Sequence, residues 1–293
     1  MKRRKASAFD VFNVLFMLLM MLVMIYPLLN VLATSLSRPS DITAGLVSWY
    51  PRGFNLVGYQ YIIEDGQLFI GYRNTILYAA VGTLLTLTLT SLAAYALTHK
   101  ELVGRRVLTF YWAVTMFFGG GLVPTYLVIK DLGLLDTFLV MVLPGCVGAY
   151  TLFVFRSFML ALPSELMEAA YIDGAGEWRV WSTIVLPLSK PLLATYALFT
   201  IVGHWNSWFN AMLYLKNANL YPLQLYLRRI VVQNDLSGTY ADSASGALIA
   251  SGAMTPQNAQ MAAIVLTILP IMLIYPYIQK YFVKGVMIGS LKG

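Results

Sequence analysis

The sequence predicts an all-α, polytopic membrane protein with six transmembrane helices. Hydrophobic residues make up 59% of the 293-residue chain and charged residues only 11%, whereas a soluble domain carries roughly 25% charged residues. Six apolar stretches are long enough to cross a hydrocarbon core about 30 Å thick, which takes about 20 residues of helix. Because backbone polar groups in lipid must bond within their own segment, stretches of this length form helices.

The predicted spans contain no Asp, Glu, Lys or Arg and cover residues 11–33, 74–97, 107–129, 137–155, 191–213 and 261–277. The first span follows the basic segment 1–5 and superficially resembles a signal peptide. Its apolar run is longer than a typical h-region, and no small-residue cleavage site follows at the right place. We therefore expect this span to remain as a helix, with a polar and aromatic outer segment after it at 34–73.

The third span contains three consecutive glycines, Gly119 to Gly121, followed by Pro124. This composition breaks helices. A break at membrane depth occurs where the backbone lines a cavity or is buried in protein, and a kink that serves packing is the alternative. The fourth span holds the single cysteine, Cys146, for which we expect a packing role because a disulfide or a metal site would need partners.

Basic residues predict the orientation of the spans. With a cytoplasmic N-terminus and alternating spans, 13 of the 20 lysines and arginines fall on the inner side and seven on the outer side. This excess on the inner side is what the positive-inside rule expects. Both termini and the segment 156–190 are therefore predicted to be cytoplasmic. The formal net charge of +7 reflects this topology and not nucleic-acid binding, since the basic residues are scattered among lipid-facing spans.

A short helix is predicted inside the segment 156–190. Pro163 ends the preceding helix, and Ser164 is a good N-cap residue. Gly174 supplies a C-terminal stop. We expect a helix over residues 165–173, followed by a turn.

The composition of this helix suits contact with another protein. Glu165 and Glu168 lie near its positive N-terminal end, where carboxylates are favoured. Ala169 and Ala170 remove bulk from one side, which lets the helix sit deeply in a groove, and Glu168 offers a charge to a basic residue there. The alternative is an ordinary amphipathic loop helix with glycine stops.

The same segment holds a complete pattern of seven fixed positions, Glu168-Ala169-Ala170, Gly174, Ile184 and Leu186-Pro187, with three, nine and one residues between them. The pattern resembles the cytoplasmic coupling loop of the permease subunits of ABC-type importers, where the loop takes up the stroke of a separate ATPase. The residues that this resemblance assigns to ATPase coupling are Glu165, Glu168, Ala169, Ala170, Asp173, Gly174, Ile184, Leu186 and Pro187.

Other stretches extend the resemblance from about residue 74 to residue 293. It is closest to the shorter, maltose-type second permease of the carbohydrate-uptake branch. Residues 117–126 and 221–225 are similar to a sub-branch that handles complex oligosaccharides, including pectin- and alginate-derived ones. In the glycine-rich tail, Ser290 and Leu291 depart from the family pattern. The stretches that carry the wider resemblance are Asn74-Thr75, 92–97, Trp205-Asn206-Ser207-Trp208-Phe209 and the tail 284–293.

The resemblance implies a type I ABC importer permease fold in the cell inner membrane, whose last five helices form the core shared across the family. The implied partners are a second homologous permease, two ATPase subunits and an extracytoplasmic sugar-binding protein, with an oligosaccharide as cargo. The chain lacks the G-x-x-x-x-G-K-[ST] loop, so ATP and Mg are expected on the ATPase subunits and no cofactor on this chain. The expected parts are 1–73, a permease core at 74–283 with its coupling loop at 156–190 and outer loop at 214–260, and a cytoplasmic tail at 284–293.

The outer loop and the tail carry two further sets of candidate residues. Residues 221–232 are expected to form an interfacial helix, in which Arg228 and Arg229 would attract an anionic sugar or anchor the helix at lipid headgroups. Residues 235–251 are rich in Ser, Gly and Ala, which is typical of a loop. By resemblance, this loop contacts the binding protein through Asp235, Ser237, Tyr240, Asp242 and Ser245. The tail is expected to reach the ATPase dimer through Gly289, Lys292 and Gly293.

The fifth span holds the densest polar cluster of any span, formed by His204, Asn206, Ser207 and Asn210. Polar residues in a span tend to face the interior, so these side chains are candidates for the translocation path. Hydrogen bonding between helices is the alternative. His204 by itself is more typical of a packing residue than of a proton relay.

An ATP-independent secondary carrier or channel is the alternative function. Carriers coupled to protons or sodium usually hold carboxylates inside the membrane or unwound ion-binding segments, and the charge-free spans argue against that. The seven-position pattern argues against both a carrier and a channel. No HExxH or GxSxG motif is present, so the chain is not expected to be an enzyme.

Overall fold

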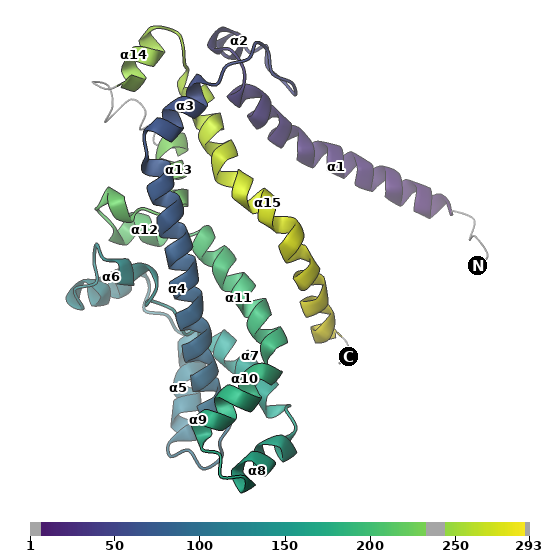
Figure 1. Ribbon diagram of the computed structural model, residues 1–293, viewed down its shortest axis with the longest axis vertical. Helices are drawn as coiled ribbons and strands as arrows, with labels where there is room; N and C mark the ends of the chain where they lie inside the picture. The colour runs from purple at the N-terminus through teal and green to yellow at the C-terminus, as the bar shows by residue number, and fades with distance from the viewer. Residues whose placement is uncertain (1–6, 233–243, 291–293) are drawn as a thin grey trace. The chain divides into compact units, whose positions relative to one another are not determined.

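The computed structural model describes residues 7–232 and 244–290, with side chains through residue 273 except at 244 and 245. Helices form nearly all of the regular structure in these residues, and the only strand-like pairing among them is an isolated bridge between Ser37 and Phe54. The all-α prediction is confirmed. Figure 1 shows the order of the helices along the chain.

Three helices in the described residues are individually long and apolar enough to cross a membrane: α1 (Ala8–Ser35), α4 (Gln67–Ala96) and α15 (Pro256–Ser290), the last counted through Leu273. They coincide with the first, second and sixth predicted spans. A fourth candidate is a pair of helical segments, Glu177–Leu188 and Lys190–Trp205, bent by 78° where they meet.

The third, fourth and fifth predicted spans are not single helices. The third divides into α5 (Arg105–Phe117) and α6 (Leu122–Asp131), and Gly121 between them has a φ of +81°. The glycine run thus breaks the helix, as its composition predicts.

In the fourth predicted span, only a 3-10 turn, η1 (Phe138–Met141), and α7 (Ala149–Leu160) are helical. Pro144 and Gly145, whose φ is +75°, interrupt the segment, because proline removes a helical hydrogen bond and glycine permits the left-handed turn. The half-buried Cys146 therefore lies in a turn. The prediction that it lies inside a membrane-spanning helix is wrong. The fifth span divides into α11 (Lys190–Trp205) and α12 (Phe209–Tyr214).

The remaining elements are short. The predicted interfacial helix is α13, which begins at residue 223 and not at 221. The other short elements are α2 (Pro39–Thr43), α3 (Val57–Glu64), α8 (Ser164–Ile172), α9 (Glu177–Val180), the π-helical η2 (Trp181–Val185), α10 (Leu186–Leu188), η3 (Ala218–Leu220), α13 (Leu223–Val232) and α14 (Ala244–Ala250).

The chain forms two compact units. One comprises Met1–Phe69 with Tyr226–Met272, and the other Ile70–Leu225 with Leu273–Gly293. In the first unit, the buried Asn258 joins α15 to the end of α1. Its Nδ2 donates to the backbone carbonyls of Thr34 and Ser35 at 3.2 and 3.0 Å, which are among the carbonyls that a helix leaves without intrahelical partners at its C-terminus.

In the second unit, α4 holds the segment that precedes α13. Asn74 donates through Nδ2 to the Asn219 and Tyr221 carbonyls at 2.8 and 3.0 Å, and the Tyr78 hydroxyl donates to the Leu220 carbonyl at 2.8 Å. The Thr75 hydroxyl accepts from the Leu223 amide at 2.9 Å. These side chains fix an irregular backbone segment that has few hydrogen bonds of its own.

Asp136 fastens two loops of the second unit to each other. Its Oδ1 accepts from the Lys216 and Asn217 amides at 2.8 Å each, and its own amide donates to the Tyr214 carbonyl at 2.9 Å. Asp136 is the only described residue other than glycine with a positive φ, at 58°, a conformation that Asp and Asn tolerate better than most residues. The two backbone amides hold the pKa of the Asp136 carboxyl below its usual range.

The lowered pKa of Asp136 predicts a pH dependence of stability. Because the pKa is lower in the folded than in the unfolded state, the stabilisation is present above the unfolded pKa and is lost as pH falls through the folded one. Thermal unfolding between about pH 7 and about pH 3, which spans the usual carboxyl range, should show this loss. Asp136→Asn, which keeps an acceptor oxygen and tolerates the positive φ, should have a flatter profile. Equal slopes for the two proteins would contradict the assignment.

Candidate functional site

The helix predicted at 165–173 is α8, which spans Ser164–Ile172. Pro163 is the N-cap residue, no side chain caps the helix, and Ser164 is already the first helical residue. The predicted N-cap is therefore wrong by one position. Proline is well suited to a helix start because it has no amide hydrogen to satisfy. Gly174 ends the helix with a φ of +79°, and its amide donates to the Tyr171 carbonyl at 3.0 Å.

The outer face of α8 is exposed along its whole length. Glu165, Glu168, Ala169 and Ile172 follow the i, i+3, i+4, i+7 spacing of one helical face, and all four are exposed, with Ile172 at 86%. The exposed Asp173 follows as the C-cap residue. These residues therefore form one continuous surface, which we call the coupling face.

The inner face of α8 packs against the body of the second unit. Met167 and Ala170 contact a buried cluster whose members come from α4, α7 and the segment after α8, among them Tyr95, Phe155 and Val180. Ala170 thus lies on the packed side and Ala169 on the coupling face. The inner face of α8 is therefore in contact with the ends of α4 and α7.

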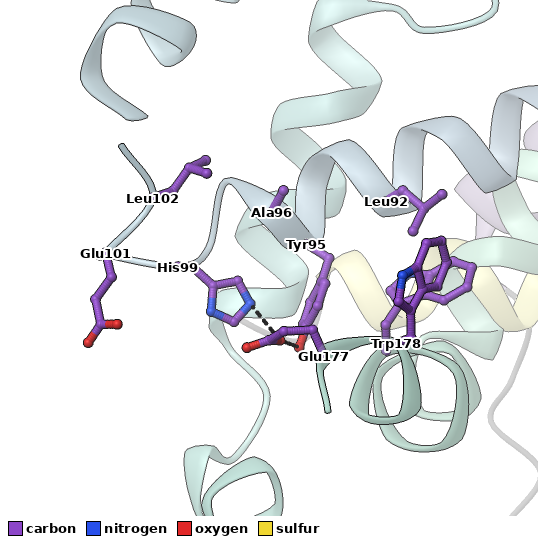
Figure 2. A pocket seen from close by; sticks show the side chains of 9 residues that line it. Leu92, Tyr95, Ala96, His99, Glu101, Leu102, Glu177 and Trp178 are labelled. Carbon is purple, nitrogen blue, oxygen red and sulfur yellow. Dashed lines mark hydrogen bonds and ion pairs between the residues drawn. The ribbon is translucent and has the colours of Figure 1, made fainter. Parts of the chain in front are cut away.

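A carboxylate joins the segment that follows α8 to the end of α4. Glu177, the first residue of α9, accepts at Oε2 from the hydroxyls of Tyr95 and Tyr171 at 2.5 and 2.9 Å. His99 Nε2 lies 3.5 Å from the same oxygen. Figure 2 shows His99 and Tyr95 converging on Glu177. Sequence reasoning missed this cluster, because its members lie far apart in the sequence and match no spacing motif.

The return segment after Gly174 is helical but strongly bent. Ile184 and Leu186 are half-buried, Pro187 is exposed, and the buried residues are Val180, Val185 and Ser189. The chain turns by 78° between residues 188 and 190. Pro191 accounts for the bend because it removes the hydrogen bond to the residue 187 carbonyl and its ring clashes there.

The predicted polar cluster of the fifth span surrounds a second break, between α11 and α12 (Figure 1). Asn206 and Asn210 are exposed, and Ser207 is half-buried. The Asn206 side chain donates to the Val202 carbonyl of its own helix at 3.0 Å. The His204 imidazole contacts α4, where it lies against Gly82.

The contact between His204 and Gly82 predicts a close-packing requirement. A Cβ added at Gly82 would overlap the imidazole, lying 2.6 Å from Cε1. Gly82→Ala should therefore lower the free energy of unfolding by about 1–2 kcal/mol through overpacking. Combined with His204→Ala, which vacates the space, the cost should be less than the sum of the two single changes. Thermal unfolding of the purified variants measures this, and additive costs would contradict the contact.

The two remaining sets of candidates fall largely outside the described residues. Ser245 belongs to α14 and Gly289 to α15. Only the backbone of these two residues is described. The candidates outside the described residues are Asp235, Ser237, Tyr240, Asp242, Lys292 and Gly293.

A family model described as "Binding-protein-dependent transport system inner membrane component" matches residues 3–288 of this chain. Protein LplC of Bacillus subtilis (strain 168) is 38% identical over 294 residues, which cover 100% of this chain and 98% of LplC. The polygalacturonan/rhamnogalacturonan transport system permease protein YtcP of the same organism is 37% identical over 290 residues, covering 99% and 100%. A solved bacterial ABC transporter involved in the import of the acidic polysaccharide alginate contains a chain with a TM-score of 0.87 and 31% identity, covering 96% of this chain and 100% of that one.

Proposed function

This chain belongs to the family of binding-protein-dependent transport system inner membrane components, and from that premise we propose that it moves acidic oligosaccharides by responding to separate ATPase subunits through α8. The family makes it a permease subunit of an ABC importer and not an enzyme. An importer of this class contains ATPase, second-permease and binding-protein partners in general.

The coupling face carries the mechanical part of the proposal. It combines three carboxylates, those of Glu165, Glu168 and Asp173, with Ile172, a large apolar side chain that is 86% exposed. A partner protein that covered this face would bury the Ile172 side chain and would meet the carboxylates with its own basic residues. Because the opposite side of α8 is packed onto the ends of α4 and α7, a force on the coupling face would move those helices.

The acidic nature of the cargo rests on the relatives. YtcP is named for polygalacturonan and rhamnogalacturonan transport, and the solved importer takes alginate. Both names denote polysaccharides that carry carboxylates. These two resemblances favour an oligosaccharide with uronate residues over a neutral one.

The remaining contacts complete the proposed complex. Both termini lie in the cytoplasm, as the distribution of basic residues favours. The tail, with Gly289, Lys292 and Gly293, reaches the ATPase dimer, and the loop around Asp235–Ser251 contacts the binding protein. Asn206 and Asn210 line the path, which their exposure beside a helix break supports.

Uptake into proteoliposomes tests the proposed substrate. The assembled importer with its binding protein should accumulate oligogalacturonate at least about tenfold faster than the methyl-esterified oligomer of the same length, a difference of about 1.4 kcal/mol. The ester control keeps the size and the hydroxyl groups and removes the charge. Equal uptake of both oligomers would refute the preference for acidic sugars.

A further inference from the structure

A pocket with a volume of about 380 Å³ lies beside the coupling segment, between the end of α4 and the start of α9 (Figure 2). Three aromatic side chains, Tyr95, Trp178 and Trp181, form part of its wall. Glu101 and Glu177 contribute carboxylates, and the remaining wall is largely apolar. The pocket is therefore built from aromatic and aliphatic side chains, two carboxylates and the His99 imidazole.

Glu177 is held so that one of its two oxygens stays available. Its three short contacts, with Tyr95, Tyr171 and His99, are all made by Oε2. Oε1 has no hydrogen-bond partner within the part of the chain that the structure describes. Figure 2 shows one oxygen of Glu177 pointing towards the side of the view on which Glu101 lies. A carboxylate oxygen fixed in this way is prepared to accept from a donor that the described part of this chain does not supply.

The basic residues near the pocket do not fill that role. No lysine or arginine is among the described residues that line it, although Lys100 and Arg179 adjoin lining residues in the sequence. Arg105 and Arg156 both direct Nε to the Leu97 carbonyl, at 3.0 and 3.1 Å, just beyond the end of α4. Among the described residues that line the pocket, His99 is thus the only basic side chain, with its Nε2 3.5 Å from Glu177 Oε2.

We propose that this pocket receives an arginine or lysine side chain of the ATPase subunit, as a second anchor beside the coupling face. Leu92 and Ala96 suit the hydrocarbon stem of such a side chain, the indole faces suit its cation, and Glu101 and Glu177 suit its charge. The proposal rests on the proposed function. The ATPase is the source because Glu177 and Trp178 follow Gly174 within the same loop, and Trp178 is 70% exposed at the rim of the pocket.

Retention of the ATPase by the purified complex tests the proposal. Glu101→Gln, Glu177→Gln and Trp178→Ala should each weaken binding about twofold to fivefold, and the two Gln variants should make release by NaCl less steep. Glu177→Gln keeps an acceptor for the tyrosines, and Glu101→Gln and Trp178→Ala leave the tyrosine cluster untouched. Glu64→Gln, an exposed carboxylate on α3, is the matched control and should bind as the wild type. Unchanged affinity and salt dependence in all three pocket variants would overturn the proposal.

Photocrosslinking identifies the occupant. Benzoylphenylalanine in place of Trp178 should form an adduct with an ATPase peptide that contains arginine or lysine. Replacing that residue by Ala should cost less affinity in the Glu177→Gln background than in the wild type, since part of the interaction is already lost there. Adducts formed only with lipid or with the second permease would overturn the proposal. If the ATPase fails to bind the wild-type complex at all, the proposed function itself is refuted. If the ATPase binds the wild type and all three pocket variants equally well, only the pocket proposal is refuted.

Discussion

Gly174→Pro is expected to abolish ATP-driven sugar uptake while the complex still assembles. Gly174 has a φ of +79°, whereas proline is fixed near −65°. Proline would also remove the amide that donates to the Tyr171 carbonyl. The end of α8 would therefore have to take another path, and the coupling face would no longer be connected to α9 in its present geometry.

The expected effect is at least about tenfold on sugar uptake per ATP hydrolysed, and Gly174→Ala should lie between the variant and the wild type. An L-residue with a left-handed backbone costs about 1–2 kcal/mol, which strains the turn without removing its hydrogen bond. The ratio of sugar transported to phosphate released, measured in proteoliposomes, separates coupling from simple loss of protein.

Gly176→Ala is the matched control for Gly174. Gly176 lies in the same loop with a φ of −77°, and a Cβ there would meet no atom within 4 Å. This variant should transport as well as the wild type. The expected tenfold loss corresponds to about 1.4 kcal/mol. If the sugar uptake per ATP of Gly174→Pro instead stays within about twofold of the wild type, α8 does not transmit the stroke.

The helix α8 was predictable because its determinants are local. Pro163 and Gly174 act through their own backbone angles, and the exposed spacing of Glu165, Glu168 and Ile172 is a property of one helix. Such signals are present in a single stretch of sequence. The one-residue error at Ser164 shows the limit of this reasoning, since serine and proline both favour a helix start and only the surrounding chain decides between them.

The tyrosine and histidine contacts to Glu177 were not predictable, because they depend on tertiary packing. Tyr95 and Glu177 are 82 residues apart, and nothing in the local pattern at either position indicates the other. His99 lies in the predicted inner loop, where it has no distinguishing neighbours. Long-range polar contacts of this kind follow only from the way that α4 and α9 meet.

The broken spans fall between these two cases. The glycine run at 119–121 correctly predicts a break in the third span, but Pro144-Gly145 and the segment 206–208 interrupt two spans that hydropathy alone treats as continuous. Hydropathy measures whether a stretch is apolar enough for a membrane. It does not measure whether the stretch keeps helical backbone angles throughout.

Gly58→Ala is expected to produce the largest loss of stability among the glycine substitutions considered. Gly58 on α3 faces Asn258 of α15, and a Cβ there would overlap the Asn258 amide and lie 3.2 Å from its backbone carbonyl oxygen. Asn258 cannot turn away freely, because its Nδ2 donates to carbonyls at the end of α1. The overlap must therefore either break these hydrogen bonds or shift the backbone.

The expected cost is about 2–3 kcal/mol, since overpacking costs about 1–3 kcal/mol and a buried group left unsatisfied costs about 1–3 kcal/mol. Thermal unfolding in detergent measures it, with Gly203→Ala as the control, because a Cβ at that helical glycine meets nothing within 4 Å and alanine favours helix. Asn258→Ala should cost a similar amount by itself, and the double variant should cost less than the sum. An unfolding free energy for Gly58→Ala within about 0.5 kcal/mol of the wild type, the range of ordinary surface substitutions, would show that Asn258 does not fix the end of α1.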